Sequence, residues 1–186
     1  MHQIKNNPYR TVGLLVGATA REQERQIKRL KQFIEADQAP QDDFSFPSLG
    51  NFHRTIDSVN DAASKLNLDK DKINAALFWF YNGNAITDEP AFDALKSGEI
   101  EGAISIWEKL TESKEISKRN ASAFFNLSTL LLNKAFVNTA NESYFYPLFI
   151  KGFELKLKFI ESEFIIDFKK LAILRILTLD FKVIDL

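Results

Sequence analysis

Side chains that could act in catalysis or bind a metal are scarce in this sequence, which contains His2, His53 and no cysteine. A histidine works as a general base when a nucleophile or an orienting carboxylate lies beside it. His53 instead stands between Phe52 and Arg54, and His2 lies in the first few residues. Two histidines without a cysteine are also too few ligands for a typical zinc site. We therefore expect no catalytic residue and no metal site.

Glycine-rich and acidic segments are the other places where a small ligand could bind. The segment Gly13-Leu14-Leu15-Val16-Gly17 matches no phosphate-binding fingerprint, and the end of a helix is its expected role. Asp42-Asp43 and the Asp69/Asp71 pair lack the alternating oxygen ligands and terminal Glu of a calcium loop. The sequence thus predicts a protein that is not an enzyme and uses no cofactor.

Hydrophobic periodicity predicts an all-α fold, in which helices and their connecting loops position the residues named above. Thr19 and Glu22 have the spacing of a capping box, and apolar residues then recur every three or four positions to about Glu35. Asp69 is expected to cap a helix that ends at Asn82-Gly83-Asn84. The expected helices cover 8–13, 19–35, 56–66, 69–81, 87–96, 100–110, 121–136 and 143–177, the last as one or two helices. Residues 177–186 would suit a strand equally well.

Charge is distributed unevenly along the chain although the net charge is −1. Residues 1–34 are basic by +5, whereas residues 35–101 are acidic by −8. The near-neutral total argues against a general nucleic-acid binder, and no aromatic residues interleave with the basic ones as stacking platforms. The basic positions of the second expected helix are Arg25, Lys28, Arg29 and Lys31. They predict either a docking patch for an acidic protein surface or a solvated face that pairs with the acidic residues 35–101.

Four consecutive aromatic residues, Phe78, Trp79, Phe80 and Tyr81, stand at the expected end of a helix. Consecutive residues of a helix lie on different faces, so the four cannot all enter one core. One or two of them should therefore lie between two helical units, or be exposed to a partner.

The order Tyr9-Arg10-Thr11-Val12-Gly13-Leu14, Ala18-Thr19-Ala20-Arg21-Glu22 and Lys28-Arg29-Leu30 resembles the opening of a J domain. The resemblance covers about 30 residues and extends more loosely to residue 81. It implies a basic second helix that docks a partner protein. The family's His-Pro-Asp tripeptide is absent, since the loop reads Ala39-Pro40-Gln41-Asp42-Asp43. The resemblance therefore implies no stimulation of a heat-shock ATPase, with a regulatory co-chaperone that lacks the tripeptide as the alternative.

A second resemblance, to tetratricopeptide repeats, begins at Leu95. Leu95 to Leu110 is similar to the turn and second helix of that repeat, and Ala121 to Ser128 to the first helix of the next one. The resemblance implies a groove in which Asn126, with Lys134, takes a peptide carboxylate; helix capping or internal hydrogen bonding is the alternative for Asn126. The spacing departs from the usual 34 residues, so we expect a repeat-like layer and not a full solenoid.

These observations together predict a J-like unit over residues 1–84 packed on a repeat-like region over residues 85–186. The charged residues within the apolar C-terminal stretch leave no span for a membrane, and the opening residues form no apolar signal region. We expect a cytoplasmic, non-enzymatic module that binds or scaffolds other proteins. The apolar end of the chain also suits a homodimer contact, hence a dimerising structural protein, or the front part of a longer protein.

Overall fold

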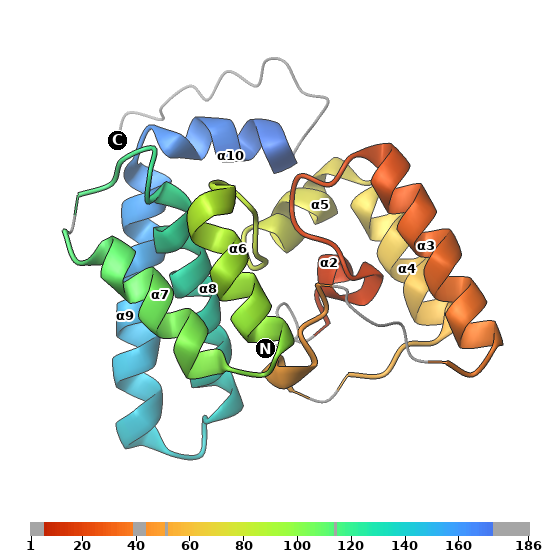
Figure 1. Ribbon diagram of the computed structural model, residues 1–186, viewed down its shortest axis with the longest axis horizontal. Helices are drawn as coiled ribbons and strands as arrows, with labels where there is room; N and C mark the ends of the chain where they lie inside the picture. Colours follow the sequence, from red (N-terminus) through yellow and green to blue (C-terminus); the bar gives the residue numbers. More distant parts are fainter. Residues whose placement is uncertain (1–5, 39–43, 51, 114, 173–186) are drawn as a thin grey trace, which may run out of the picture.

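The computed structural model describes residues 6–38, 44–50, 52–113 and 115–172, and these residues confirm the all-α fold. The helices are α2 (Pro8–Val12), α3 (Ala20–Glu35), the short 3-10 helix η1 (Pro47–Leu49), α4 (Ile56–Leu66), α5 (Asp69–Ala76), α6 (Ala85–Lys96), α7 (Ile100–Thr111), α8 (Ala121–Val137), α9 (Glu142–Glu161) and α10 (Phe164–Ala172). Helices α2 to α4 form one side of the molecule and α6 to α9 the other (Figure 1). α10 lies across the second group and also contacts α5. Residues 177–186 lie outside the described residues.

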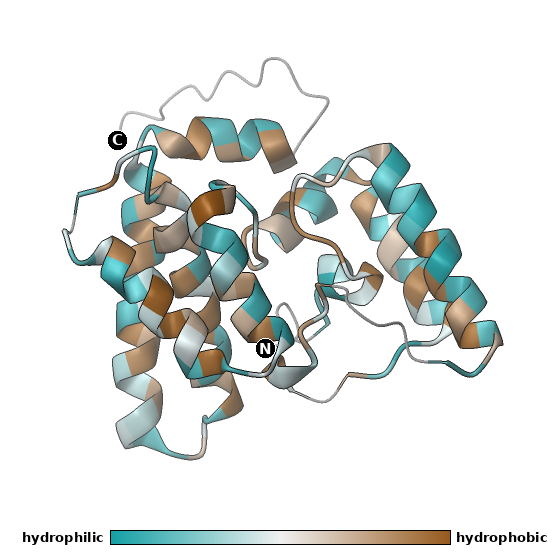
Figure 2. Ribbon diagram, viewed as in Figure 1, coloured by the Kyte–Doolittle hydropathy of each residue, from teal (hydrophilic) through white to brown (hydrophobic). Residues whose placement is uncertain are grey.

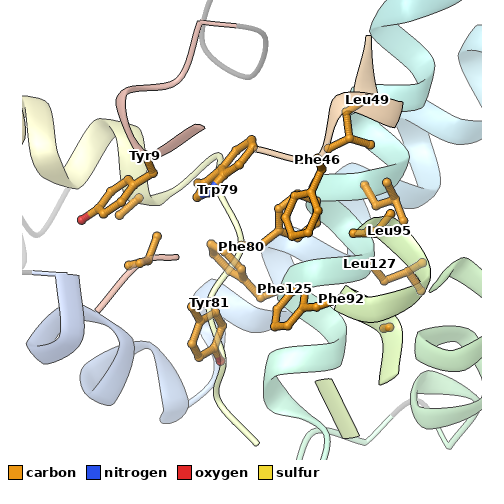
Figure 3. Close-up of a cluster of buried hydrophobic side chains, with 14 of the residues drawn as sticks. Tyr9, Phe46, Leu49, Trp79, Phe80, Tyr81, Phe92, Leu95, Phe125 and Leu127 are labelled. Atoms are coloured by element: carbon orange, nitrogen blue, oxygen red, sulfur yellow. The ribbon is translucent and has the colours of Figure 1, made fainter. Parts of the chain in front are cut away.

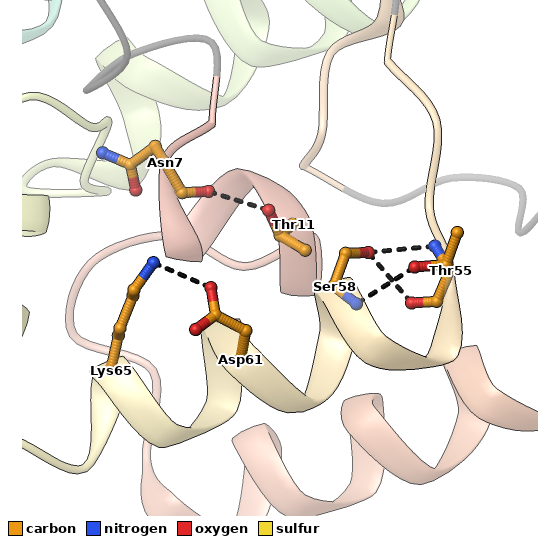
Figure 4. Close-up of polar contacts among 6 residues, drawn as sticks. All are labelled: Asn7, Thr11, Thr55, Ser58, Asp61 and Lys65. Atoms are coloured by element: carbon orange, nitrogen blue, oxygen red, sulfur yellow. Dashed lines mark hydrogen bonds and ion pairs between the residues drawn. The ribbon is translucent and has the colours of Figure 1, made fainter.

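The structure confirms the helix start predicted at Thr19 and the helix end predicted at Gly13. Thr19 and Glu22 form the expected capping box, in which the Thr19 hydroxyl accepts from the Glu22 N–H at 3.2 Å. Gly13 ends α2 with a φ of 68°, a left-handed conformation that glycine adopts without strain. A second capping box joins Thr55 and Ser58 at the start of α4 (Figure 4).

Helix α5 departs from the prediction at both ends. Leu68 is its N-cap residue, and the Asp69 side chain does not cap it. The helix stops at Ala76, and the next residues leave the helical path, so that the Val16 N–H donates to the Phe80 carbonyl at 2.9 Å. Gly83 has no positive φ, so the predicted left-handed helix end there is wrong. α6 in turn begins at Ala85, two residues before the predicted start.

The prediction that the four aromatic residues cannot all enter one core is wrong, because the run lies in this non-helical segment and not on a helix. Trp79 and Phe80 are fully buried, Tyr81 is 5 % exposed, and Phe78 is partly buried. Figure 3 shows the Trp79, Phe80 and Tyr81 side chains leaving one stretch of chain toward different neighbours. Trp79 lies against Phe46, Phe80 stacks on Trp107, and Tyr81 meets Phe125 and Phe168. A single buried hydrophobic cluster, rich in aromatic side chains, therefore connects the helices before residue 84 with those after it.

Candidate functional site

Helix α3 carries the predicted basic patch on its solvent side. Leu30 is fully buried and Ile27, Phe33 and Ile34 are partly buried, as their spacing predicted. Arg25, Lys28 and Arg29 are exposed, whereas Lys31 is half-buried. In Figure 2 the visible face of α3 is predominantly hydrophilic. We call Arg25, Lys28, Arg29 and Lys31 the basic face.

A surface groove of about 400 Å³ runs beside this basic face, between α3 and α4. Its lining residues are Gln23, Glu24, Ile27, Lys28, Lys31, Ala63 and Asn67. Ile27 and the small Ala63 give the groove an apolar part, and Lys28 and Lys31 place two cations along it. Because lysine stems are apolar and lysine heads are charged, such a lining suits an apolar side chain that has an acidic neighbour.

The four cations are not neutralised internally within the described part of the chain. No ion pair joins Arg25, Lys28, Arg29 or Lys31 to an acidic side chain there. Arg29 lies over the Phe33 ring at 5.4 Å. The alternative prediction, that this face pairs with acidic residues of the segment 35–101, therefore finds no such pair among the described residues.

Glu22 and Glu24, on the same helix, are acidic neighbours of the basic face, and Glu24 lines the groove together with Lys28 and Lys31. Backbone and side-chain hydrogen bonds from Thr19 lower the pKa of Glu22, and the charge of Arg25 lowers it further. Glu22 therefore stabilises the start of α3, where a negative charge interacts favourably with the helix dipole.

Asn126 and Lys134 do not line a common groove, so that prediction is wrong. Asn126 is fully buried; it accepts from the Tyr81 N–H at 3.1 Å and donates to the Tyr81 carbonyl at 2.9 Å. Lys134 forms an ion pair with Glu101 on α7 and lies near the Tyr144 ring. The predicted alternative for Asn126, internal hydrogen bonding, matches these contacts.

Asp88 was missed as a buried residue, because acidic residues near a helix start are usually solvated. It is fully buried and accepts from Trp107 Nε1 at 3.0 Å, from the backbone N–H groups of Gly83 and Asn84 at 3.1 and 3.0 Å, and from Asn126 Nδ2 at 3.4 Å. Burial raises the pKa of the Asp88 carboxyl, and the hydrogen bonds from Asn84, Trp107 and Gly83 oppose that effect. Because its oxygens accept hydrogen bonds from these protein donors, we assign Asp88 a structural role.

Lys156 was also missed, and its burial has no signal in the sequence. The residue is 6 % exposed; its Nζ donates to Thr129 Oγ1 at 2.8 Å and lies 3.4 Å from the centre of the Phe125 ring. No carboxylate pairs with it among the described residues. Burial holds the pKa of Lys156 well below the usual value for lysine. Because the amine is enclosed, it is not accessible as a nucleophile, and we expect its burial to lower the stability of the fold.

His53 is exposed and lines a smaller groove of about 280 Å³ beside α2 and α4. The acidic residue there, Asp61, pairs with Lys65 at 2.7 Å (Figure 4). Asp61 is thus engaged by a cation. The Thr11 and Ser58 hydroxyls of this groove donate to the Asn7 and Thr55 carbonyls, and among the described residues neither is hydrogen-bonded to His53 as a nucleophile would be to its base. Among the described residues no group of three or more His, Asp or Glu side chains could hold a metal ion. None of the described helices has the length and apolar character needed to cross a membrane.

Comparisons with known proteins add no assignment. No protein-family model, no curated protein and no solved structure matches this chain. The candidate site therefore rests on geometry alone: the basic face of α3 and the groove beside it.

Proposed function

We propose that this chain is a non-enzymatic protein-interaction module that binds an acidic, partly apolar segment of a partner protein on α3. The observation that carries the proposal is the basic face beside the α3–α4 groove, whose cations form no ion pair within the described residues. Acidic side chains of the partner would meet Lys28 and Lys31 along the groove and Arg25 and Arg29 farther round the helix, and an apolar side chain would enter between Ile27 and Ala63. If the rest of the chain binds a second protein as well, the chain acts as a scaffold.

The experiment is a selection of peptides on the purified chain, from a displayed library that is unbiased in charge. Enriched peptides should combine Asp or Glu with apolar residues. The triple variant Arg25→Glu, Lys28→Glu and Arg29→Glu should lose them. A control variant with the same change in charge, Lys109→Glu, Lys118→Glu and Arg119→Glu, alters exposed cations elsewhere and should keep them. Absence of acidic peptides among those enriched, or equal binding of the acidic peptides by both variants, would reject the proposal.

An active co-chaperone is the second candidate, favoured by the order of a short helix, a basic helix and a third helix at the start of the chain. An assay of a heat-shock ATPase with and without this chain separates the two. Binding without stimulation supports the module, and stimulation that the triple variant abolishes supports the co-chaperone.

A further inference from the structure

Helix α9 has two apolar faces, and within the described part of the chain only one of them packs into the core. Its inner face packs on α8, with Phe159 fully buried and Gly152 accepting from the Ser128 hydroxyl at 2.6 Å. A Cβ at Gly152 would lie 3.0 Å from Leu132 Cγ, so the two helices are in close contact there. This face fixes the position of α9, and the other face is therefore turned away from α8.

The outer face carries five large apolar side chains in one line. Tyr146 and Ile150 are each 53 % exposed, Phe153 is 49 %, and Leu157 and Ile160 are 41 % and 40 %. We call these residues the outer stripe. They follow at alternating steps of four and three residues, the spacing of a seam between two packed helices, over a length of roughly 21 Å. Single exposed apolar residues are ordinary on protein surfaces, whereas a continuous line of them marks a contact site.

Charges along the outer stripe distinguish between its possible occupants. Helical spacing places Glu154 and Glu161 along the same edge, and no ion pair engages either one among the described residues. Lys158 projects farther round the helix, toward Lys151, which pairs with Glu108 on α7 at 2.6 Å. If a second copy packed antiparallel on this face, Glu154 would meet Glu154 of that copy, and like charges in contact oppose association.

We propose that the outer stripe binds an amphipathic helix of another protein, one with apolar residues at heptad spacing and Lys or Arg along one edge. Its apolar residues pack between those of the outer stripe, and its cations lie beside Glu154 and Glu161. This surface is separate from the basic face of α3 and has the opposite charge preference. One chain can thus hold an acidic partner on α3 and a basic partner on α9.

The absence of cysteine allows a site-specific test on the full chain. A fluorophore on Ser143→Cys, beside the outer stripe, should respond on titration with a synthetic helix of about 20 residues that has Leu at heptad spacing and Lys on one edge. A fluorophore on the exposed Ser105→Cys of α7 should not. Glu154→Lys with Glu161→Lys should weaken binding about tenfold at low salt, and the control Glu112→Lys with Glu115→Lys should leave it unchanged. Phe153→Gln with Leu157→Gln should abolish it, and since both side chains are half-exposed this variant should keep the helical circular dichroism of the wild type.

Two results would overturn the proposal. One is no response of the Ser143→Cys fluorophore to the Lys-edged peptide, or an equal response when the Lys edge of the peptide is replaced by Glu. The other is a homodimer in analytical ultracentrifugation that Phe153→Gln with Leu157→Gln dissociates, because the occupant would then be a second copy.

Discussion

The side chain of Asn126 and the backbone of Tyr81 are joined by two hydrogen bonds, one in each direction. The Asn126 side chain thus supplies hydrogen-bond partners for the N–H and C=O of Tyr81, which lies in an extended segment between helices. It also brings α8 beside Asp88, whose carboxylate lies within 3.4 Å of Asn126 Nδ2. The residues from Tyr81 to Asp88 are therefore held by polar contacts as well as by the hydrophobic cluster.

Removal of the Asp88 carboxylate tests this network. Asp88→Ala should lower the free energy of unfolding by about 2–4 kcal/mol, because the buried Trp107 Nε1 and two backbone N–H groups would lose their acceptor. Urea denaturation measures the change. Asp93→Ala, on the exposed side of the same helix, should change the free energy by less than about 0.5 kcal/mol. Equal effects of the two substitutions would show that the network contributes nothing.

Lys156 should cost stability near neutral pH. Lys156→Met should raise the free energy of unfolding at pH 7 by about 1–3 kcal/mol, since it removes a buried amine without a carboxylate partner. Because burial lowers the folded-state pKa, the unfolded chain binds more protons between that pKa and 10.5, and the wild type gains stability as pH rises through this window. The advantage of Lys156→Met should therefore shrink between pH 7 and pH 10. An advantage that does not change with pH, or a less stable variant, would contradict this.

Two helical glycines should respond in opposite directions to alanine. Gly152→Ala should destabilise by about 1–3 kcal/mol, because its Cβ would crowd Leu132 and force α8 and α9 apart. Gly102→Ala on α7 has no contact closer than 3.6 Å and should stabilise by about 0.5–1 kcal/mol through helix propensity. Thermal unfolding of the two variants should thus bracket that of the wild type, and shifts of the same sign would argue against the close packing of α9 on α8.

Helices with regular apolar spacing were predictable from the sequence, and their caps were too where a side chain signals them, as at Thr19. The end of α5 was not, because the apolar residues that follow Ala76 fit a helical period equally well. What decides their conformation is a pairing with Val16, more than 60 positions earlier in the chain. A tertiary partner of this kind leaves no local signal.

The candidate site was predictable in part. The basic face of α3 follows from the charge pattern, since exposed positions of an amphipathic helix can be read from its apolar ones. The groove beside it needed the structure, because it depends on where Ala63 of α4 lies against Ile27. The outer stripe also needed the structure, because the helical spacing of Phe153, Leu157 and Ile160 does not show whether that apolar face is covered.

The most direct test of the central claim, that the basic face of α3 docks an acidic partner, is the salt dependence of binding to a defined ligand. The ligand is a fluorescent amphipathic helix with Leu on one face and Glu beside it, and the readout is anisotropy. We predict that its affinity falls at least about tenfold between about 50 and 300 mM salt, and that Arg25→Glu, Lys28→Glu and Arg29→Glu abolish it. Binding that is insensitive to salt and unchanged in the triple variant would contradict the account.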